Sequence, residues 1–291
     1  MAFIKELKQK YTHGALPVKF IFINAALFLC VRLVEVVCTL FDIGFDIASY
    51  LELPSHPALL LQRPYTAVTY MFLHNDLLHL LFNMLWLYWF GQLFLRFFTA
   101  RQFGGLYITG GLCGAVLFVA AYNLLPYFAG KEGMLLGASA AVLAVVFAVS
   151  AYAPDYKIRL LLIGDISLKY IALITVLLDL TSLTSLNSGG HIAHLGGALT
   201  GWIFALRWKR GKDITRGINR IIDAFVSLLR PRRKSAPKNT GYRRPTNDEE
   251  YRQQRQENIA EIDRILDKIK QTGYNALTDE EKKRLFDAGK K

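Results

Sequence analysis

The chain reads Leu136-Gly137-Ala138-Ser139-Ala140 where a long apolar run begins, and this run continues to about Ala153. A second apolar segment contains an imidazole in the stretch Gly190-His191-Ile192-Ala193-His194-Leu195-Gly196-Gly197. Polar and ionisable groups at membrane depth are costly to desolvate, so they tend to face a protein interior or a hydrated cavity and to serve a function. Ser139 and His194 are therefore candidates for a nucleophile and its base.

Composition indicates a membrane protein with a polar tail. Hydrophobic residues make up 53% of 291 positions, although the last third of the chain is strongly charged, so the apolar residues are concentrated in blocks. A helix needs about 20 apolar residues to cross a bilayer core. Six segments approach this length, at roughly 20–41, 77–95, 103–125, 138–153, 160–180 and 191–208. The sequence predicts an all-α polytopic membrane protein, with a six-helix bundle followed by a small helical tail.

The spans and the charged segments suggest five regions. The first apolar run is too long for a signal peptide and has no small-residue cleavage site, so we expect it to be a retained span. Amphipathic spacing after the last span predicts an interfacial helix, and a basic, proline-containing stretch follows it. The predicted regions are a cytoplasmic N-terminus (1–17), a membrane domain (18–208), the interfacial helix (209–230), a basic linker attracted to anionic lipid (231–247) and a helical C-terminal extension (248–291).

The C-terminal extension reads as two short helices. One carries an apolar stripe from Ile259 to Ile269, and the other begins at Thr278-Asp279-Glu280-Glu281, which has the pattern of a capping box. The sequence does not indicate a role for this extension.

Lysine and arginine are unevenly divided between the connections on the two sides of the membrane. The N-terminus, the second and fourth connections and the segment after the last span are basic, whereas the other connections hold few uncompensated cations. Cytoplasmic connections are enriched in these residues. We therefore expect a multi-pass protein of the cell (inner) membrane with both termini in the cytoplasm and with Ser139 and His194 near the outer face.

Two further patterns accompany these residues. Gly137, Gly197 and Gly201 have the small side chains that let membrane helices approach closely. His79 and Asn83 are four residues apart at the start of the second span and therefore share a helix face. Such a pair can donate hydrogen bonds to a developing oxyanion in a water-poor site, or can simply join neighbouring helices.

Together these motifs resemble the rhomboid intramembrane serine proteases. The matching elements are His79-x-x-x-Asn83, Gly137-Ala138-Ser139, and Ala193-His194-Leu195-Gly196-Gly197 with Gly201, in this order on a six-span frame. The resemblance implies an endopeptidase without cofactor or metal that hydrolyses transmembrane proteins near the outer membrane face. It implies Ser139 as nucleophile, His194 as general base in a dyad without a carboxylate, and His79 and Asn83 as oxyanion donors beside the Ser139 N–H.

Two positions depart from the family pattern. Ala140 stands where the family usually has glycine, so its methyl group could crowd the oxyanion hole, although a regular helix start would tolerate alanine. Leu143 stands where relatives often have an aromatic residue stacked on the histidine, which could loosen the imidazole.

Other interpretations account for parts of the same sequence. A catalytically inactive rhomboid-like protein that binds membrane helices would keep the same frame. A metal site could use His74, His79, His191 and His194 with Asp76, but it would leave Ser139 unexplained. Nucleic-acid binding is not expected, because no aromatic platform or groove-reading motif accompanies the basic linker. The three cysteines have no metal-site spacing and are expected to pack in the spans.

Overall fold

The structure is a computed structural model that describes residues 9, 11–160, 164–229 and 248–288. It contains two compact units, Met1–Leu229 and Arg230–Lys291, and each is described by itself. The predicted basic linker (231–247) and most of residues 1–10 lie outside the described residues.

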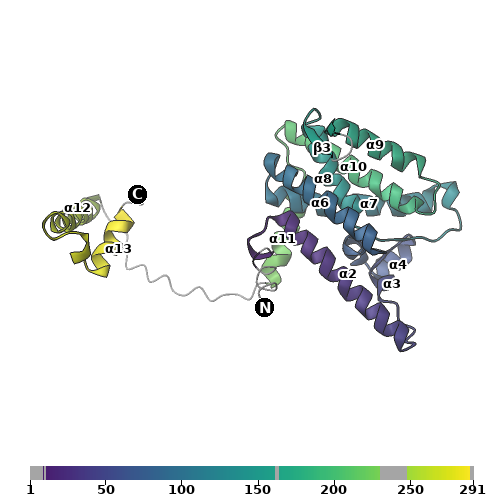
Figure 1. Cartoon of the computed structure of the whole chain (residues 1–291), viewed down its shortest axis with the longest axis horizontal. Coiled ribbons are helices and arrows are strands. Elements are labelled where there is room, and N and C mark those ends of the chain that lie inside the picture. The colour runs from purple at the N-terminus through teal and green to yellow at the C-terminus, as the bar shows by residue number, and fades with distance from the viewer. Residues whose placement is uncertain (1–8, 10, 161–163, 230–247, 289–291) are drawn as a thin grey trace. The chain divides into compact units, whose positions relative to one another are not determined.

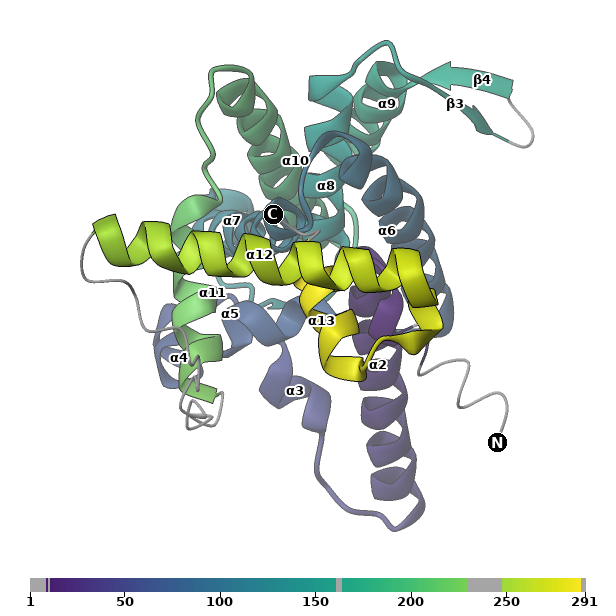
Figure 2. The ribbon, with the colours of Figure 1, turned by 90° about the vertical axis from the view of Figure 1, so that its left-hand side faces the viewer.

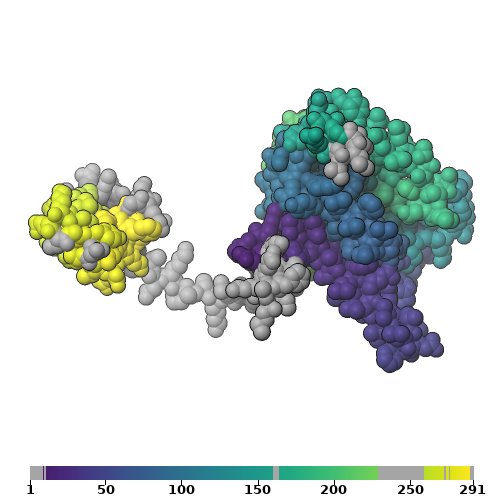
Figure 3. Space-filling view, in the orientation of Figure 1, coloured from purple at the N-terminus to yellow at the C-terminus, as the bar shows by residue number. Residues whose placement is uncertain are grey.

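A bundle of long helices forms the first unit, and the predicted all-α fold is confirmed (Figure 1). Three of the helices, α2, α6 and α7, are long and apolar enough to cross a membrane, judged by length and composition among the described residues. Helix α2 lies at the edge of the bundle, and the space-filling view shows its purple surface on the outside of the unit (Figure 3). The bundle helices are α2 (Leu16–Leu40), α6 (Leu77–Phe97), α7 (Ala100–Leu124), α8 (Ser139–Tyr152), α9 (Leu168–Thr181) and α10 (Ser188–Lys209).

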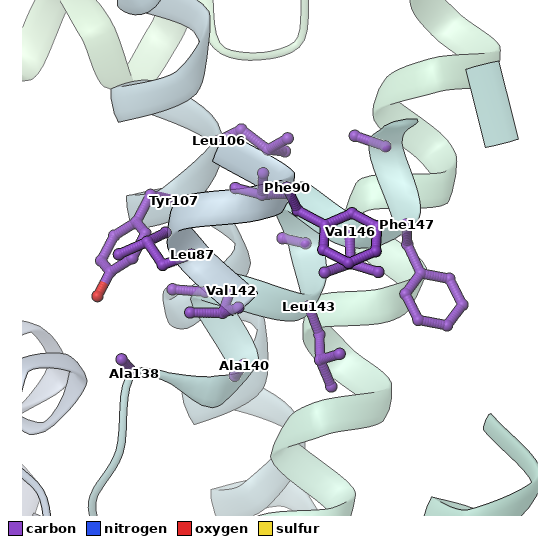
Figure 4. Close-up of a cluster of buried hydrophobic side chains, with 14 of the residues drawn as sticks. Leu87, Phe90, Leu106, Tyr107, Ala138, Ala140, Val142, Leu143, Val146 and Phe147 are labelled. Carbon is purple, nitrogen blue, oxygen red and sulfur yellow. The ribbon is translucent and has the colours of Figure 1, made fainter. Parts of the chain in front are cut away.

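Helix α8 is the centre of the bundle. Every residue from Ala140 to Ser150 is buried, as expected for a helix that is apolar on all sides and enclosed by other helices. Its side chains share one hydrophobic core with those of α6 and α7. Figure 4 shows Val142, Leu143 and Val146 of this helix in one cluster with Leu87, Phe90, Leu106 and Tyr107.

Small residues bring α7 and α10 against α8. A Cβ atom added to Gly110 of α7 would overlap the Ala144 side chain of α8, and one added to Gly201 of α10 would overlap the Ala144 carbonyl oxygen. Glycine removes the side chain that would hold these backbones apart. The three helices therefore pack at close backbone distance.

The connection from α2 to α6 is long and structured. It contains α3 (Ile47–Leu51), β1 (Leu53–Pro54), α4 (Pro57–Gln62), α5 (Thr66–Thr69) and the 3₁₀ turn η1 (Tyr70–Phe72). The strand β1 pairs antiparallel with β2 (Met134–Leu135), which lies after the turn η2 (Pro126–Phe128) and shortly before α8. This pairing fixes the segment that leads into Ser139.

The fifth predicted span began too early. Residues from 157 onward form a β-hairpin of β3 (Lys157–Leu160) and β4 (Gly164–Ser167), and α9 starts only at Leu168 (Figure 2). The alternation Lys157-Ile158-Arg159-Leu160 has the two-residue period of a strand, and Gly164 has a positive φ of 84°. The predicted start of the fifth span at residue 160 was therefore wrong, because α9 begins at Leu168.

Helix α11 (Arg216–Leu229) follows the bundle within the first unit. It contacts the start of α7 through an ion pair between Arg101 and Asp223 and through buried Asn219, whose side chain lies against the Gly105 backbone. Several large apolar side chains of α11 remain exposed, namely Ile221, Phe225, Val226 and Leu228.

The second unit is a helical hairpin of α12 (Asp248–Thr272), the turn η3 (Tyr274–Ala276) and α13 (Asp279–Ala288). The predicted capping box is confirmed, because the Thr278 N–H donates to the Glu281 carboxylate and the Glu281 N–H donates to the Thr278 hydroxyl. Lys268 donates to the same carboxylate at 2.9 Å, and this contact lowers the pKa of Glu281.

Candidate active site

The hydroxyl of Ser139 and the imidazole of His194 meet in the bundle. Ser139 is the first residue of α8, and His194 lies in the second turn of α10. The Ser139 Oγ and His194 Nε2 atoms are 2.6 Å apart. Gly197 permits this approach, because any Cβ on it would overlap the carbonyl oxygen of Ala140.

A third group, which the sequence reading missed, completes this arrangement. The Asp179 Oδ1 atom lies 2.8 Å from His194 Nδ1 and also 2.8 Å from His191 Nδ1. Asp179 stands near the end of α9, and only residues 182–187 separate α9 from α10. The short connection places Asp179 beside the first turns of α10, so the structure differs from the predicted dyad without a carboxylate.

The signal for Asp179 was present in the sequence. It is an ionisable residue in the otherwise apolar stretch Val176-Leu177-Leu178-Asp179-Leu180, the same anomaly that singled out Ser139. The side chain is buried, with 7% of its surface exposed. The carboxylate contacts only become visible once the helices are placed.

The hydrogen-bond partners indicate which ring nitrogen of His191 and of His194 carries the proton. An ionised carboxylate only accepts, so each histidine Nδ1 donates to Asp179. In the neutral imidazole the other nitrogen is an acceptor. Therefore His194 Nε2 accepts from the Ser139 hydroxyl, which is the orientation that a general base requires.

His79 borders the same space from α6. Its Nδ1 accepts a 3.4 Å hydrogen bond from the Asn75 N–H, so Nε2 carries the proton in the neutral ring. A Cβ atom added to Gly137 would lie 3.2 Å from His79 Nε2 and 3.5 Å from Ser139 Oγ, so both side chains border the space beside this glycine. The neighbouring His74 packs its ring on His79, and burial lowers the pKa of His74 to about 4, so its ring is neutral near pH 7.

Asn83 is buried one turn after His79 on the same helix. Its Nδ2 donates to the His79 carbonyl oxygen at 3.0 Å. An amide nitrogen has two N–H donors, so one remains for another acceptor. Among the described residues, no hydrogen bond joins Asn83 to Ser139.

The structure also places the two departures from the family pattern. Ala140 directs its methyl group toward α7, where a Cβ on Gly114 would come within 2.8 Å of it. The methyl group therefore fills the interface between α7 and α8. Leu143 is buried in the core cluster (Figure 4).

Four of the six histidines form two pairs of rings. His191 and His194 contact each other and Asp179, whereas His74 contacts His79. Asp76 instead accepts from the His79 N–H and caps α6. Among the described residues, Asp179, His191 and His194 form the one group whose atoms could also hold a metal ion, but each 2.8 Å contact is an ordinary hydrogen bond between donor and acceptor.

An apolar groove of about 550 Å³ lies elsewhere, between α8, α9 and α10. Neither Ser139 nor His194 lines it, and its walls include Phe147, Val176 and Trp202. Its apolar lining suits the lipid-facing side of the bundle.

Comparisons with known proteins identify the family of the chain. Residues 61–210, just over half of the chain, match the Rhomboid domain family. Residues 245–291 match a family of unknown function (DUF6576). The chain is 32% identical over 153 residues to "Presenilin-associated rhomboid-like protein A, mitochondrial" of Danio rerio, covering 50% of this chain and 39% of that protein. It is 29% identical over 161 residues to "RHOMBOID-like protein 12, mitochondrial" of Arabidopsis thaliana, covering 52% and 48%. The chain thus spans less than half the length of these curated relatives.

Proposed function

The chain belongs to the rhomboid family, and from this premise we propose that it is an intramembrane serine endopeptidase. Ser139 is the nucleophile and His194 the general base in this proposal. The observation that carries it is the 2.6 Å contact between Ser139 Oγ and His194 Nε2 inside an apolar bundle.

The reaction follows from that contact. A serine hydroxyl becomes nucleophilic when an adjacent base removes its proton. As Oγ attacks the carbonyl carbon of a peptide bond, His194 Nε2 takes the hydroxyl proton and then gives it to the departing amine nitrogen. This leaves the acyl group bound to Oγ as an ester. The same imidazole then takes a proton from a water molecule, which attacks the ester carbon, and gives that proton to Oγ as the carboxyl product leaves.

Oxyanion stabilisation is assigned to donors at the start of α8. The first N–H groups of an α-helix, here including that of Ser139, have no intrahelical acceptors. Ala138 provides no side-chain cap for them either. These N–H groups carry the partial positive charge of a helix N-terminus. The Nε2–H of His79 and the second N–H of Asn83 supply side-chain donors in the proposal.

Helix length supports a reaction below the membrane surface. The 14 residues of α8 span about 21 Å, which is shorter than the apolar core of about 30 Å. Its other end leads into Asp155, Lys157 and Arg159, which favour the polar interface. Ser139 is therefore expected to lie within the membrane, and its substrates are expected to be transmembrane segments whose helix is weak near the outer face.

The location of the protein is part of the same proposal. We place it in the cell (inner) membrane with both termini in the cytoplasm, because the more basic connections lie at the end of the bundle opposite Ser139. Helix α11 then lies on the cytoplasmic leaflet, with exposed Ile221, Phe225 and Leu228 toward lipid and with Arg216 and Arg220 available to anionic headgroups.

A serine-directed fluorophosphonate tests the activity directly. The reagent should label the purified chain at Ser139, and cleavage of co-expressed single-span proteins should occur only with an intact pair. Ser139→Ala and His194→Ala should each lower cleavage by about 10³-fold or more. The matched control is Ser150→Ala, which removes a buried hydroxyl of the same helix that has no hydrogen-bond partner among the described residues; it should keep wild-type activity.

The outcome separates the proposal from its alternative. A correctly inserted chain that is neither labelled nor proteolytic, yet still associates with membrane helices, would be a catalytically inactive rhomboid-like protein. Cleavage that survives Ser139→Ala would exclude Ser139 as the nucleophile.

A further inference from the structure

Asp179 is the ionisable side chain of α9 that the apolar packing of the bundle does not explain. It is buried, and its recorded hydrogen-bond partners are His191 and His194. Taking a carboxylate out of water is costly unless it is paired and hydrogen-bonded. A leucine at this place would serve a purely apolar helix better, so the carboxylate calls for a role tied to the histidines.

We propose that Asp179 is the positioning residue of the site, so that Ser139, His194 and Asp179 form a triad. This inference rests on the proposed function. The Oδ1 atom of Asp179 accepts the proton-bearing Nδ1 of His194 and so keeps Nε2 aimed at the Ser139 hydroxyl. When Nε2 takes the serine proton, the ring becomes an imidazolium with a proton on each nitrogen. The carboxylate stabilises that cation and stays ionised while the proton passes on to the leaving amine.

His191 supports the same arrangement indirectly, through its contact with Asp179. It stands three residues before His194, so both rings lie on one face of α10, and both donate to the same oxygen atom of Asp179. Two donors on one oxygen restrict rotation of the carboxylate. His191 therefore orients the group that orients His194.

The same hydrogen bonds also tie α9 to α10, and this raises a competing explanation. The buried residues of α9 are Leu168, Ile171 and Asp179, while much of its remaining surface is exposed. Loss of the carboxylate could thus loosen the helix without any effect on His194 itself. A decisive test has to separate the orientation of His194 from the attachment of α9.

The experiment measures fluorophosphonate labelling of Ser139 in the purified full chain as a function of reagent concentration. This yields the maximal rate of labelling (kinact) and the half-saturating concentration (KI) separately. The variants are Asp179→Asn, which removes the charge at nearly constant shape, and Asp179→Glu, which keeps it. The control is Asp155→Asn. Asp155 is an exposed carboxylate outside α9, and its Oδ1 pairs with the Nζ of Lys169 in α9 at 2.6 Å.

Asp179→Asn should lower kinact by about 10²- to 10⁴-fold with KI within about twofold of wild type and an unchanged thermal unfolding midpoint. Asp179→Glu should recover part of that loss, and Asp155→Asn should behave as wild type. A wild-type kinact in Asp179→Asn would overturn the positioning role while leaving Ser139 and His194 in place. A loss of labelling that Asp179→Glu shares in full, together with a lower unfolding midpoint, would assign Asp179 to helix attachment and would also overturn it. No labelling of the wild-type chain would instead count against the proposed function.

Discussion

At the scale of single residues, Gly137 leaves open a space that both His79 and Ser139 border. Its φ of 130° lies in the region that residues with a Cβ atom rarely adopt. Its N–H donates to the Tyr70 carbonyl oxygen at 2.9 Å, which holds the loop against the turn η1. A Cβ at this position would also come within 3.1 Å of the His79 ring.

Gly137→Ala should therefore lower the rate of Ser139 labelling by about 100-fold, comparable with the loss of one oxyanion donor, because the methyl group would displace the His79 ring or the backbone that leads into α8. The control is Gly130→Ala, at which φ is also positive, 72°, but no atom lies within 4 Å of the added Cβ. It also places a side chain at a positive φ, away from the site, and should label normally. Equal rates in the two variants would show that the space above Gly137 has no part in the reaction.

The candidate site could be predicted from the sequence only as far as isolated anomalies reach. Ser139 and His194 stand out because each is polar in an apolar run, and the structure brings them together. Asp179 has the same local signal, but its significance depends on a helical hairpin that closes over the 182–187 connection. Likewise, nothing local to Ala140 indicates that its methyl group packs against Gly114.

At the scale of elements, helix α8 is held between α7 and α10 by contacts in which glycine faces backbone or a methyl group. Gly201 shows this most clearly, because a Cβ on it would overlap the Ala144 carbonyl oxygen, a backbone atom that cannot rotate away. Separating α10 from α8 at this point would also move His194, which lies two turns earlier on the same helix.

Gly201→Ala should destabilise the bundle by about 1–3 kcal/mol, the usual penalty for inserting a methyl group into a filled interface, and should also slow the labelling of Ser139. Thermal unfolding in detergent measures the first effect. Gly104→Ala is the control within α7, since the nearest atom to its added Cβ is a flexible Leu16 methyl at 3.4 Å. It should leave stability unchanged or raise it by about 0.5–1 kcal/mol, because alanine is the better helix former. Similar destabilisation in both variants would rule out a special contact at Gly201.

The bundle helices were largely predictable, whereas the short elements α3, β1, α4, α5 and β2 between them were not. The wrong start of α9 has a physical cause. Long apolar runs predicted the bundle helices because burial in lipid and in the core demands the same residue types. Gly164 begins strand β4 with a positive φ, and residues 157–160 alternate as a strand does, so hydrophobicity alone placed the start of α9 eight residues too early. Backbone conformation, which hydropathy ignores, decided that boundary.

At the scale of the first unit as a whole, the more basic connections share one end of the bundle, while Arg63 and Lys131 lie in the other connections. Arg96, near the end of α6, donates to the Tyr156 hydroxyl just before β3, at 2.8 Å. Lys209, at the end of α10, donates to the Ala151 carbonyl oxygen of α8, at 2.9 Å. These contacts place the basic connections together, whereas Ser139 begins α8 at the opposite end.

Such an asymmetry predicts the orientation in the membrane, because cationic connections are retained on the cytoplasmic side. In a variant without the native cysteines, Ser185→Cys in the exposed 182–187 connection should react with a membrane-impermeant maleimide added to intact spheroplasts. Asp165→Cys, in the exposed part of the β3–β4 hairpin, should react only after the membrane is permeabilised. Labelling of both after permeabilisation controls for reactivity. The opposite pattern would place the active-site end in the cytoplasm, so that substrates would have to be cleaved near their inner ends and the basic segments after α10 would face away from the anionic leaflet proposed to bind them.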